Sequence, residues 1–346
     1  MNMTNGNSAA DFAFDDGHWR HWRLTQIYNL QDVEGALSQG LMTEDDARSD
    51  TPDTAVEALL ARILARGEIG ARRTLLGPDL KALERLEELS ERAPHLKELT
   101  ALVRRHIQAA LVMQAPLTLP PLLLLGPTGT GKTWFMAKLT EAIGVPYRLY
   151  PMSGSTLGEG LQGSHPVWRD SRPGLVARTL LSEPTANFLV VVDEIDKAAD
   201  HGGSDPFRPF YGLLDRSNSV NFVDEFLGFP IDASAISWVA TANDIADIPS
   251  AVLDRLMIIE VPEMDSRQRI IVARSIYADI NARHGGYFDG QLPQSVVQRV
   301  LDINPRRCRI AIEDALIRAA ADGRRLIEPE DVQPVKAVSK RRTALH

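Results

Sequence analysis

Residues 122–135 read LLLLGPTGTGKTWF, and this stretch decides the fold of the chain. The four leucines predict a buried strand, and the residues that follow Lys132 are compatible with a helix. Between strand and helix, the spacing of Gly126, Gly131, Lys132 and Thr133 reproduces the Walker A pattern. In such a loop, backbone N–H groups bind phosphate oxygens, the lysine adds a positive charge and the threonine hydroxyl ligates Mg²⁺. The residues expected to hold the nucleotide are Gly126, Pro127, Thr128, Gly129, Thr130, Gly131, Lys132 and Thr133.

A second apolar strand is predicted in FLVVVDEIDK, residues 188–197. A continuous β-branched run is typical of a central parallel strand, whose carboxyl end delivers side chains to the edge of the sheet. Asp193 is expected to hold Mg²⁺, and Glu194 to polarise the water that attacks a phosphoryl group. An Asp-Glu pair buried without a cation is costly, which weighs against a purely structural role.

Two later strands carry polar residues near their ends. AISWVATAND, residues 235–244, predicts an apolar strand that ends at Asn243. IPSAVLDRLMIIEVP, residues 248–262, places Arg255 just before another apolar strand. A later helix begins with two arginines in INPRRCRI. Taken alone, each of these side chains also fits a solvated surface position.

Composition describes an ordinary globular chain. The 346 residues are 44% hydrophobic and 24% charged, and the formal net charge is −8. That charge gives no overall attraction to nucleic acid or to acidic lipid. The single cysteine, Cys308, excludes an intramolecular disulfide and a cysteine-rich zinc site. No apolar run is long enough to cross a membrane and the N-terminus does not resemble a signal peptide, so we expect a cytoplasmic protein without membrane contact.

The residues before the Walker A loop change character several times. Residues 1–17 are small and polar and predict a mobile tail, whereas residues 18–75 predict a small helical module. Residues 76–115 predict a helical linker made of amphipathic helices. HWRHWR, residues 18–23, could contact nucleic acid, but packing or a partner surface is the preferred interpretation of so short a segment.

Together these segments resemble an AAA+ ATPase, and most closely the ATPase module of the Lon proteases, over approximately residues 80–335. The matching segments are GPTGTGKT, VVVDEIDK, GLLDRSNSVNFVDEFLGFPIDAS and WVATANDIADIPSAVLDR. The resemblance implies an α/β fold with a P-loop NTPase core and a parallel five-stranded sheet over residues 116–263. A helical lid over residues 264–336 and a basic tail of residues 337–346 would follow.

The same resemblance implies roles for the later polar residues. Asn243 would be the sensor 1 residue, which helps to orient the attacking water. Arg255 would be the arginine finger that reaches the nucleotide of a neighbouring subunit. Arg306 would be the sensor 2 residue on the lid, and Arg307 is the less favoured candidate for that role.

A tryptophan lies in SHPVWRDSRPG, residues 164–174, where prolines and glycine disfavour a regular helix or strand. A lone Trp168 would usually be a packed side chain. In Lon-like modules, however, a glycine-bounded loop at this point carries an aromatic residue into the pore of a ring, and a Pro-Gly pair follows it. By resemblance, Trp168 and Arg169 would form such a pore loop. The family usually has tyrosine and then an aliphatic residue, so the arginine could indicate an unusual substrate.

We therefore expect an ATP- and Mg²⁺-dependent ATPase that forms a homo-oligomeric, hexameric ring and remodels a protein substrate. Residues 18–75 would choose the substrate or an adaptor. The chain ends shortly after the lid at VSKRRTALH, and Ser339-Lys340 has no domain around it, so protease activity is not expected. The alternatives are a nucleic-acid-associated AAA+ motor or loader and a slow nucleotide-dependent assembly switch. The acidic charge balance disfavours the motor, and the complete set of catalytic residues disfavours the switch.

Overall fold

The structure is a computed structural model that describes residues 22–42, 53–153, 158–168, 170–198 and 205–333. At its centre lies a five-stranded sheet in which every neighbouring pair of strands is parallel, as the sequence predicts. In spatial order the strands are β4 (Tyr147–Pro151), β5 (Leu189–Asp193), β8 (Ser237–Ala242), β3 (Leu122–Leu125) and β9 (Met257–Glu260). The predicted α/β class and strand number are confirmed.

Side chains of the central strands alternate between the two faces of the sheet. Leu122 and Leu124 belong to one apolar cluster, whereas Leu123 belongs to the other. The first cluster includes residues of α4 (Lys81–Arg92), α5 (Lys97–Met113) and α6 (Lys132–Ile143). The opposite cluster includes residues of α8 (Leu175–Ser182) and α9 (Arg208–Leu213). Both faces of the central strands β5, β8 and β3 are covered, which explains why these strands are mostly apolar, whereas the edge strands β4 and β9 are partly exposed.

The N-terminal segment contains strands as well as the predicted helices. Its elements are β1 (Trp22–Gln26), α1 (Leu30–Met42), α2 (Asp53–Ala65), α3 (Gly67–Gly70) and β2 (Arg72–Leu76). β1 pairs with β2 in an antiparallel ladder, which a purely helical interpretation of residues 18–75 misses. Because the two strands are separated by three helices, no local sequence pattern reveals their pairing. Ile27, Tyr28 and Val33 are buried in the cluster that also covers β5 and β8.

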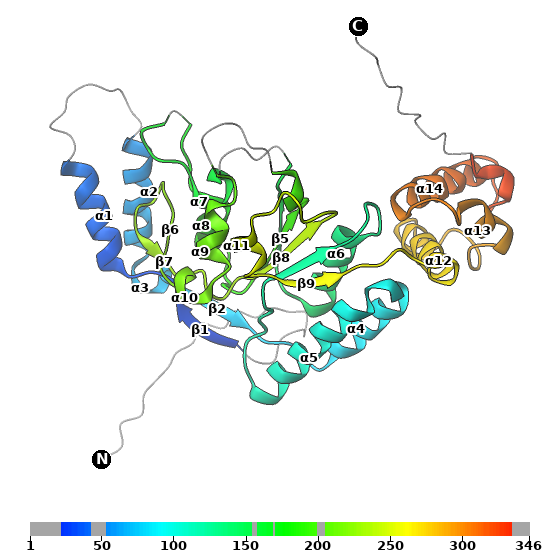
Figure 1. Ribbon diagram of the computed structural model, residues 1–346, viewed down its shortest axis with the longest axis horizontal. Coiled ribbons are helices and arrows are strands. Elements are labelled where there is room, and N and C mark those ends of the chain that lie inside the picture. The colour runs from blue at the N-terminus through cyan, green and yellow to red at the C-terminus, as the bar shows by residue number, and fades with distance from the viewer. Residues whose placement is uncertain (1–21, 43–52, 154–157, 169, 199–204, 334–346) are drawn as a thin grey trace, which may run out of the picture.

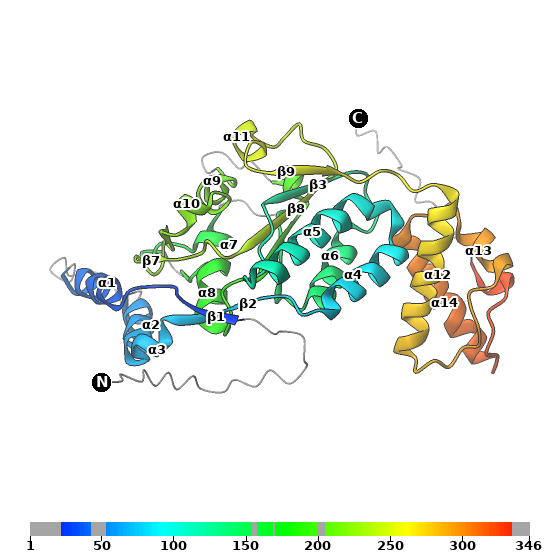
Figure 2. The same cartoon turned by 90° about the horizontal axis from the view of Figure 1, so that it is seen from below.

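Three helices of the predicted lid form a separate apolar cluster. They are α12 (Ser266–Arg283), α13 (Gln294–Val300) and α14 (Pro305–Ala321), and the short helix η4 (Pro329–Asp331) follows them. Asp265 begins α12 in a capping box with Gln268, and Asn304 caps α14. The lid lies at one end of the molecule and α1 and α2 at the other (Figures 1 and 2).

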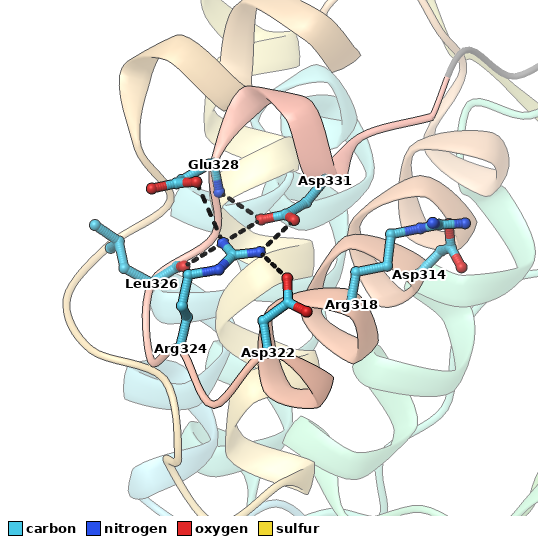
Figure 3. A network of polar contacts seen from close by, with 7 residues as sticks. All are labelled: Asp314, Arg318, Asp322, Arg324, Leu326, Glu328 and Asp331. Atoms are coloured by element: carbon cyan, nitrogen blue, oxygen red, sulfur yellow. Dashed lines mark hydrogen bonds and ion pairs between the residues drawn. The ribbon is translucent and has the colours of Figure 1, made fainter.

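An arginine holds the C-terminal end of the lid together. Arg324 donates two hydrogen bonds to the carboxylate of Asp331, at 2.8 and 2.6 Å, and one to Asp322 at 2.9 Å (Figure 3). Its hydrogen bonds lower the pKa of the Asp331 carboxyl group. Bidentate pairing of this kind fixes orientation as well as charge. The segment after α14 is therefore fastened back onto the helical lid.

The remaining described elements are short and connect the layers. They are η2 (Pro94–Leu96), α7 (Glu159–Gln162), η3 (Ile195–Lys197), α10 (Arg216–Ser219), β6 (Phe222–Val223), β7 (Pro230–Ile231) and α11 (Ser250–Leu253). The tails predicted at residues 1–17 and 337–346 lie outside the described residues, as do Ser339 and Lys340. No helix in the described part of the chain has the length and apolar character needed to cross a lipid bilayer.

Candidate active site

The Walker A loop runs from the end of β3 into α6, and its glycines are required by its shape. Gly129 and Gly131 have φ angles of +80° and +88°, in the left-handed region that side chains disfavour. A Cβ on Gly126 would lie 2.2 Å from the carbonyl oxygen of Val261, which is too close for any side chain. The loop thus takes a conformation in which its backbone is open to a ligand.

Lys132 begins α6 and points back into this loop. Its Nζ donates to the carbonyl oxygens of Gly126 and Pro127, at 2.6 and 3.0 Å, and to Asn243 Oδ1 at 3.4 Å. Burial lowers the pKa of the Lys132 ammonium group, and the nearby carboxylate of Asp196 acts in the opposite direction. The lysine is therefore a buried positive charge at the point where phosphate would bind.

Two oxygen ligands for a cation meet at the end of β5. The Thr133 hydroxyl donates to Asp193 Oδ1 at 2.8 Å, although the two residues lie on different elements. A hydroxyl and a carboxylate are the hard oxygen donors that Mg²⁺ prefers, and Mg²⁺ usually keeps several waters and binds substrate phosphates as well. These residues fit the metal that the Walker A pattern implies. Thr128, Gly129, Thr130 and Gly131 lie on the same cavity and leave room for the phosphates.

Thr241 on β8 was not anticipated from the sequence, yet it joins the two acidic residues. Its hydroxyl donates to Asp193 Oδ1 at 2.5 Å and accepts from the backbone N–H of Glu194 at 3.0 Å. Glu194 has a φ angle of +55°, which is costly for a residue with a side chain. The hydroxyl of Thr241 thus holds Glu194 in a strained conformation at the edge of the sheet. Its position two residues before Asn243 was the available signal.

These residues line a cavity of about 500 Å³ between the sheet and the lid. Asp193, Glu194 and Asn243 line it from the strand ends, and Arg306 lines it from the beginning of α14. Arg307 is not among the described residues that line the cavity, and its backbone N–H donates to the cap residue Asn304 at 3.0 Å. Of the two sensor 2 candidates, Arg306 therefore lines the cavity and Arg307 does not, and Arg309 of the same helix also lines it.

Helix α4 contributes further cavity residues that the sequence analysis did not single out. Arg92 lies 5.8 Å from the ring centre of Trp134, a cation–π distance, and donates to the hydroxyl of Ser275 at 2.8 Å. Just after α4, the buried His95 lies with its Nε2 2.8 Å from the carbonyl oxygen of Thr130. Burial lowers the pKa of this imidazole. The segment predicted as a linker therefore forms one wall of the site.

The predicted residues Arg255 and Trp168 are not among the described residues that line the cavity. Arg255 follows α11 and donates to the carbonyl oxygen of Ala251 at 2.5 Å. Trp168 is 66% exposed, so it does not have the buried side chain that the packed alternative requires. The Arg169 prediction falls outside the described residues. Thus the structure brings together the Walker A residues, Asp193, Glu194, Asn243 and Arg306 in one cavity, but not the arginine-finger candidate Arg255 or the pore-loop candidate Trp168.

Comparison with known proteins agrees with this geometry. Residues 122–263 match the family described as "ATPase family associated with various cellular activities (AAA)". This segment is an AAA domain. It spans the sheet from β3 to just beyond β9, and it contains Lys132, Asp193, Glu194, Asn243 and Arg255. An AAA domain implies nucleotide binding, and its Walker A residues Lys132 and Thr133 line the cavity described above.

The AAA domain is similar to that of Lon proteases. A mitochondrial Lon protease homolog of Zea mays is 34% identical over 160 residues, which are 46% of this chain and 16% of that protein. One of Candida albicans is 31% identical over 185 residues, covering 52% of this chain and 17% of that protein. The Lon protease of Aster yellows witches'-broom phytoplasma is 29% identical over 171 residues, covering 49% and 22%. The similarity to Lon proteases covers about half of this chain, and the matched part is about a fifth or less of the length of these relatives.

Proposed function

We propose that this chain binds ATP with Mg²⁺ and hydrolyses it to ADP and phosphate. The observation that carries the proposal is the 2.8 Å contact between the Thr133 hydroxyl and the Asp193 carboxylate. These residues lie sixty positions apart and belong to different elements, yet they meet beside Lys132 and Glu194 in one cavity. A metal-ligating pair, a phosphate-binding lysine and a carboxylate base are the groups that phosphoryl transfer requires.

Each group has one task in the proposed reaction. Thr133 and Asp193 would hold Mg²⁺, which when bound neutralises charge on the phosphates. Lys132 would exchange its contacts with the loop carbonyls for phosphate oxygens. Glu194 would accept the proton of the attacking water, and Asn243 would orient that water. Arg306 would bind the phosphates from the side of the lid.

The test compares two variants that should fail in different ways. Lys132→Ala removes a phosphate contact and should abolish measurable nucleotide binding. Glu194→Gln should leave binding intact and lower turnover by about 10² to 10⁴, the usual contribution of a positioned base. Isothermal titration with ATP and a phosphate-release assay measure the two quantities. Wild-type turnover in Glu194→Gln would refute the assigned role of Glu194.

We further propose that the protein acts as a ring, in which Arg255 completes the site of the neighbouring subunit and Trp168 grips a protein chain. The proposal is supported by the position of Arg255 away from its own cavity and by the 66% exposure of Trp168. It is also supported by similarity to proteins named Lon proteases. A hexamer is the proposed ring size, and selection of the substrate by residues 18–75 remains part of this proposal.

A further inference from the structure

The Trp168 loop, residues 163–174, has a glycine at each end of its base. Gly163 follows α7 with a φ angle of +84°, and Gly174 is the N-cap residue just before α8. A Cβ on Gly174 would lie 2.4 Å from the backbone nitrogen of Gly163, so the two ends of the loop touch. Ser164 N–H also donates to the carbonyl oxygen of Arg172 at 3.2 Å. The described tip of the loop is exposed, but its base is tightly packed.

A carboxylate from a distant segment lies directly against this base. Asp224, between β6 and β7, is fully buried, and its Oδ2 accepts from Gly174 N–H at 2.8 Å. A Cβ on Gly163 would lie 2.6 Å from Asp224 Oδ1, so only glycine leaves room for the carboxylate there. The neighbouring Glu225 N–H donates to the carbonyl oxygen of Gln162 at 2.8 Å. Both ends of the Trp168 loop are thus in contact with one turn.

The Asp224 carboxylate also accepts hydrogen bonds from the turn that contains it, residues 224–228. Asp224 Oδ1 accepts from the N–H groups of Phe226 and Leu227, at 3.0 and 3.2 Å, and the Asp224 carbonyl oxygen accepts from Gly228 N–H at 2.9 Å. One buried side chain therefore bonds two segments that lie 50 residues apart in the sequence. A buried carboxylate with three N–H donors is satisfied only while both segments keep their positions.

We infer that Asp224 is the positioning residue of the Trp168 loop, and that residues 224–228 and this loop move as one unit. A displacement of the 224–228 turn would then carry the base of the Trp168 loop with it. The inference rests on the proposed function only in the claim that Trp168 contacts a substrate protein.

Hydrogen exchange of the full chain, followed by mass spectrometry, tests the hydrogen bond from Gly174 N–H to Asp224. Asp224→Asn replaces an acceptor oxygen by a donor, so exchange in peptides covering residues 163–174 should become about 10- to 100-fold faster. Glu225→Gln is the matched control, because the Glu225 side chain lies 3.7 Å from Arg208 and is not among the described groups that bond the loop. Unchanged exchange at residues 163–174 in Asp224→Asn would overturn the inference.

A second measurement needs no variant and covers the case in which Asp224→Asn does not fold. In the wild-type protein at low denaturant, the amides of Gly174, Phe226 and Leu227 should open together, with the same dependence on denaturant. Gly174 exchanging much faster than the other two would show independent segments and overturn the inference.

A functional measurement separates this inference from the proposed function. The probe is a permanently unfolded, carboxymethylated protein, and the measured quantity is the ratio of stimulated to basal ATP turnover. Asp224→Asn and Trp168→Ala should both bring this ratio close to one, and Glu225→Gln should not. If Trp168→Ala keeps the wild-type ratio while Asp224→Asn still loosens the loop, the positioning role stands and the substrate role of Trp168 fails.

Discussion

At the scale of single residues, the proposed catalytic carboxylates Asp193 and Glu194 are bonded by a hydroxyl that the sequence motifs do not include. Thr241 is 2% exposed and bonds both the Asp193 carboxylate and the backbone N–H of Glu194. Hydrogen bonds to charged groups contribute about 1.5 to 3 kcal/mol when buried. Asp193 and Glu194 are therefore held by a neighbouring strand as well as by their own.

Thr241→Val keeps the shape of the side chain and removes its hydroxyl. Glu194 would lose the bond that holds its strained backbone, so we expect ATP turnover to fall by about 10- to 100-fold while nucleotide affinity changes little. Thr241→Ser keeps the hydroxyl and serves as the control, with turnover within about threefold of wild type. Steady-state kinetics decide the matter, and equal losses in both variants would contradict the role of the hydroxyl.

Asp224 makes folding stability depend on pH. Burial raises the pKa of its carboxyl group to about 6, against the opposing N–H bonds from Gly174, Phe226 and Leu227. Between about pH 4 and 6, Asp224 keeps its proton in the folded protein but has released it in the unfolded chain. The free energy of unfolding therefore falls as the pH rises through this range. A pKa raised to about 6 corresponds to a change of about 3 kcal/mol in the free energy of unfolding.

The comparison with Asp224→Asn isolates this contribution. As pH rises from about 4 to 7, the free energy of unfolding of the wild type should fall by about 3 kcal/mol relative to that of the variant. Denaturant titrations at several pH values measure this difference. A difference that stays constant with pH would contradict the raised pKa.

At the scale of elements, α4 joins the AAA core to the lid. Arg92 lies at the end of α4, donates to Ser275 of α12 and forms an ion pair with Asp279 of the same helix. The same guanidinium group lies over Trp134, next to the Walker A threonine. Since the nucleotide cavity lies between core and lid, one side chain connects three of its walls.

Arg92→Ala should loosen the lid over the cavity. Loss of the partly buried contacts of Arg92 with Ser275, Asp279 and Trp134 should raise the dissociation constant for ATP by about tenfold, equivalent to about 1.4 kcal/mol. Arg104→Ala is the matched control, because Arg104 pairs with the exposed Glu87 and an exposed pair contributes little. Titration calorimetry measures the dissociation constant for ATP in both variants. An Arg92→Ala affinity equal to that of the control would refute the connection.

At the scale of the whole molecule, the proposed arginine finger, Arg255, is not among the described residues that line the cavity of its own chain. The Arg255 side chain bonds Ala251, and its Nε has no hydrogen-bond partner among the described residues. A second subunit that placed its cavity against this arginine would bring a bound nucleotide to the guanidinium group. The proposed ring would provide this arrangement.

Mixing two inactive variants tests the shared site. Arg255→Ala alone should bind ATP and assemble, yet hydrolyse about 10³- to 10⁵-fold more slowly. In an equimolar mixture with Glu194→Gln, about a quarter of the interfaces would pair an intact Glu194 with an intact Arg255 if subunits combine at random in a ring. Turnover should therefore recover in part. Full activity of an Arg255→Ala monomer at every dilution would contradict the model of a shared site.

Local sequence patterns were enough to predict the elements that carry the phosphate-binding loop and the acidic strand end. The Walker A spacing and the apolar runs that end at Asp193 and Asn243 predict the loop, the strands and the edge of the sheet where the polar residues meet. The central parallel strands are buried on both faces of the sheet, so their sequences are mostly apolar and easily recognised. Arg306 was assigned only through family resemblance, and its place in the cavity agrees with that assignment.

Only the tertiary structure decided which distant segments share a surface. The pairing of β1 with β2, the contact of Arg92 with the lid and the bond from Gly174 to Asp224 all join residues far apart in the chain. Such contacts leave no periodic signal, because each depends on how whole layers pack rather than on neighbouring residues. The helices predicted as a linker cover one face of the sheet for the same reason: amphipathic spacing predicts an apolar face but not the surface that it covers.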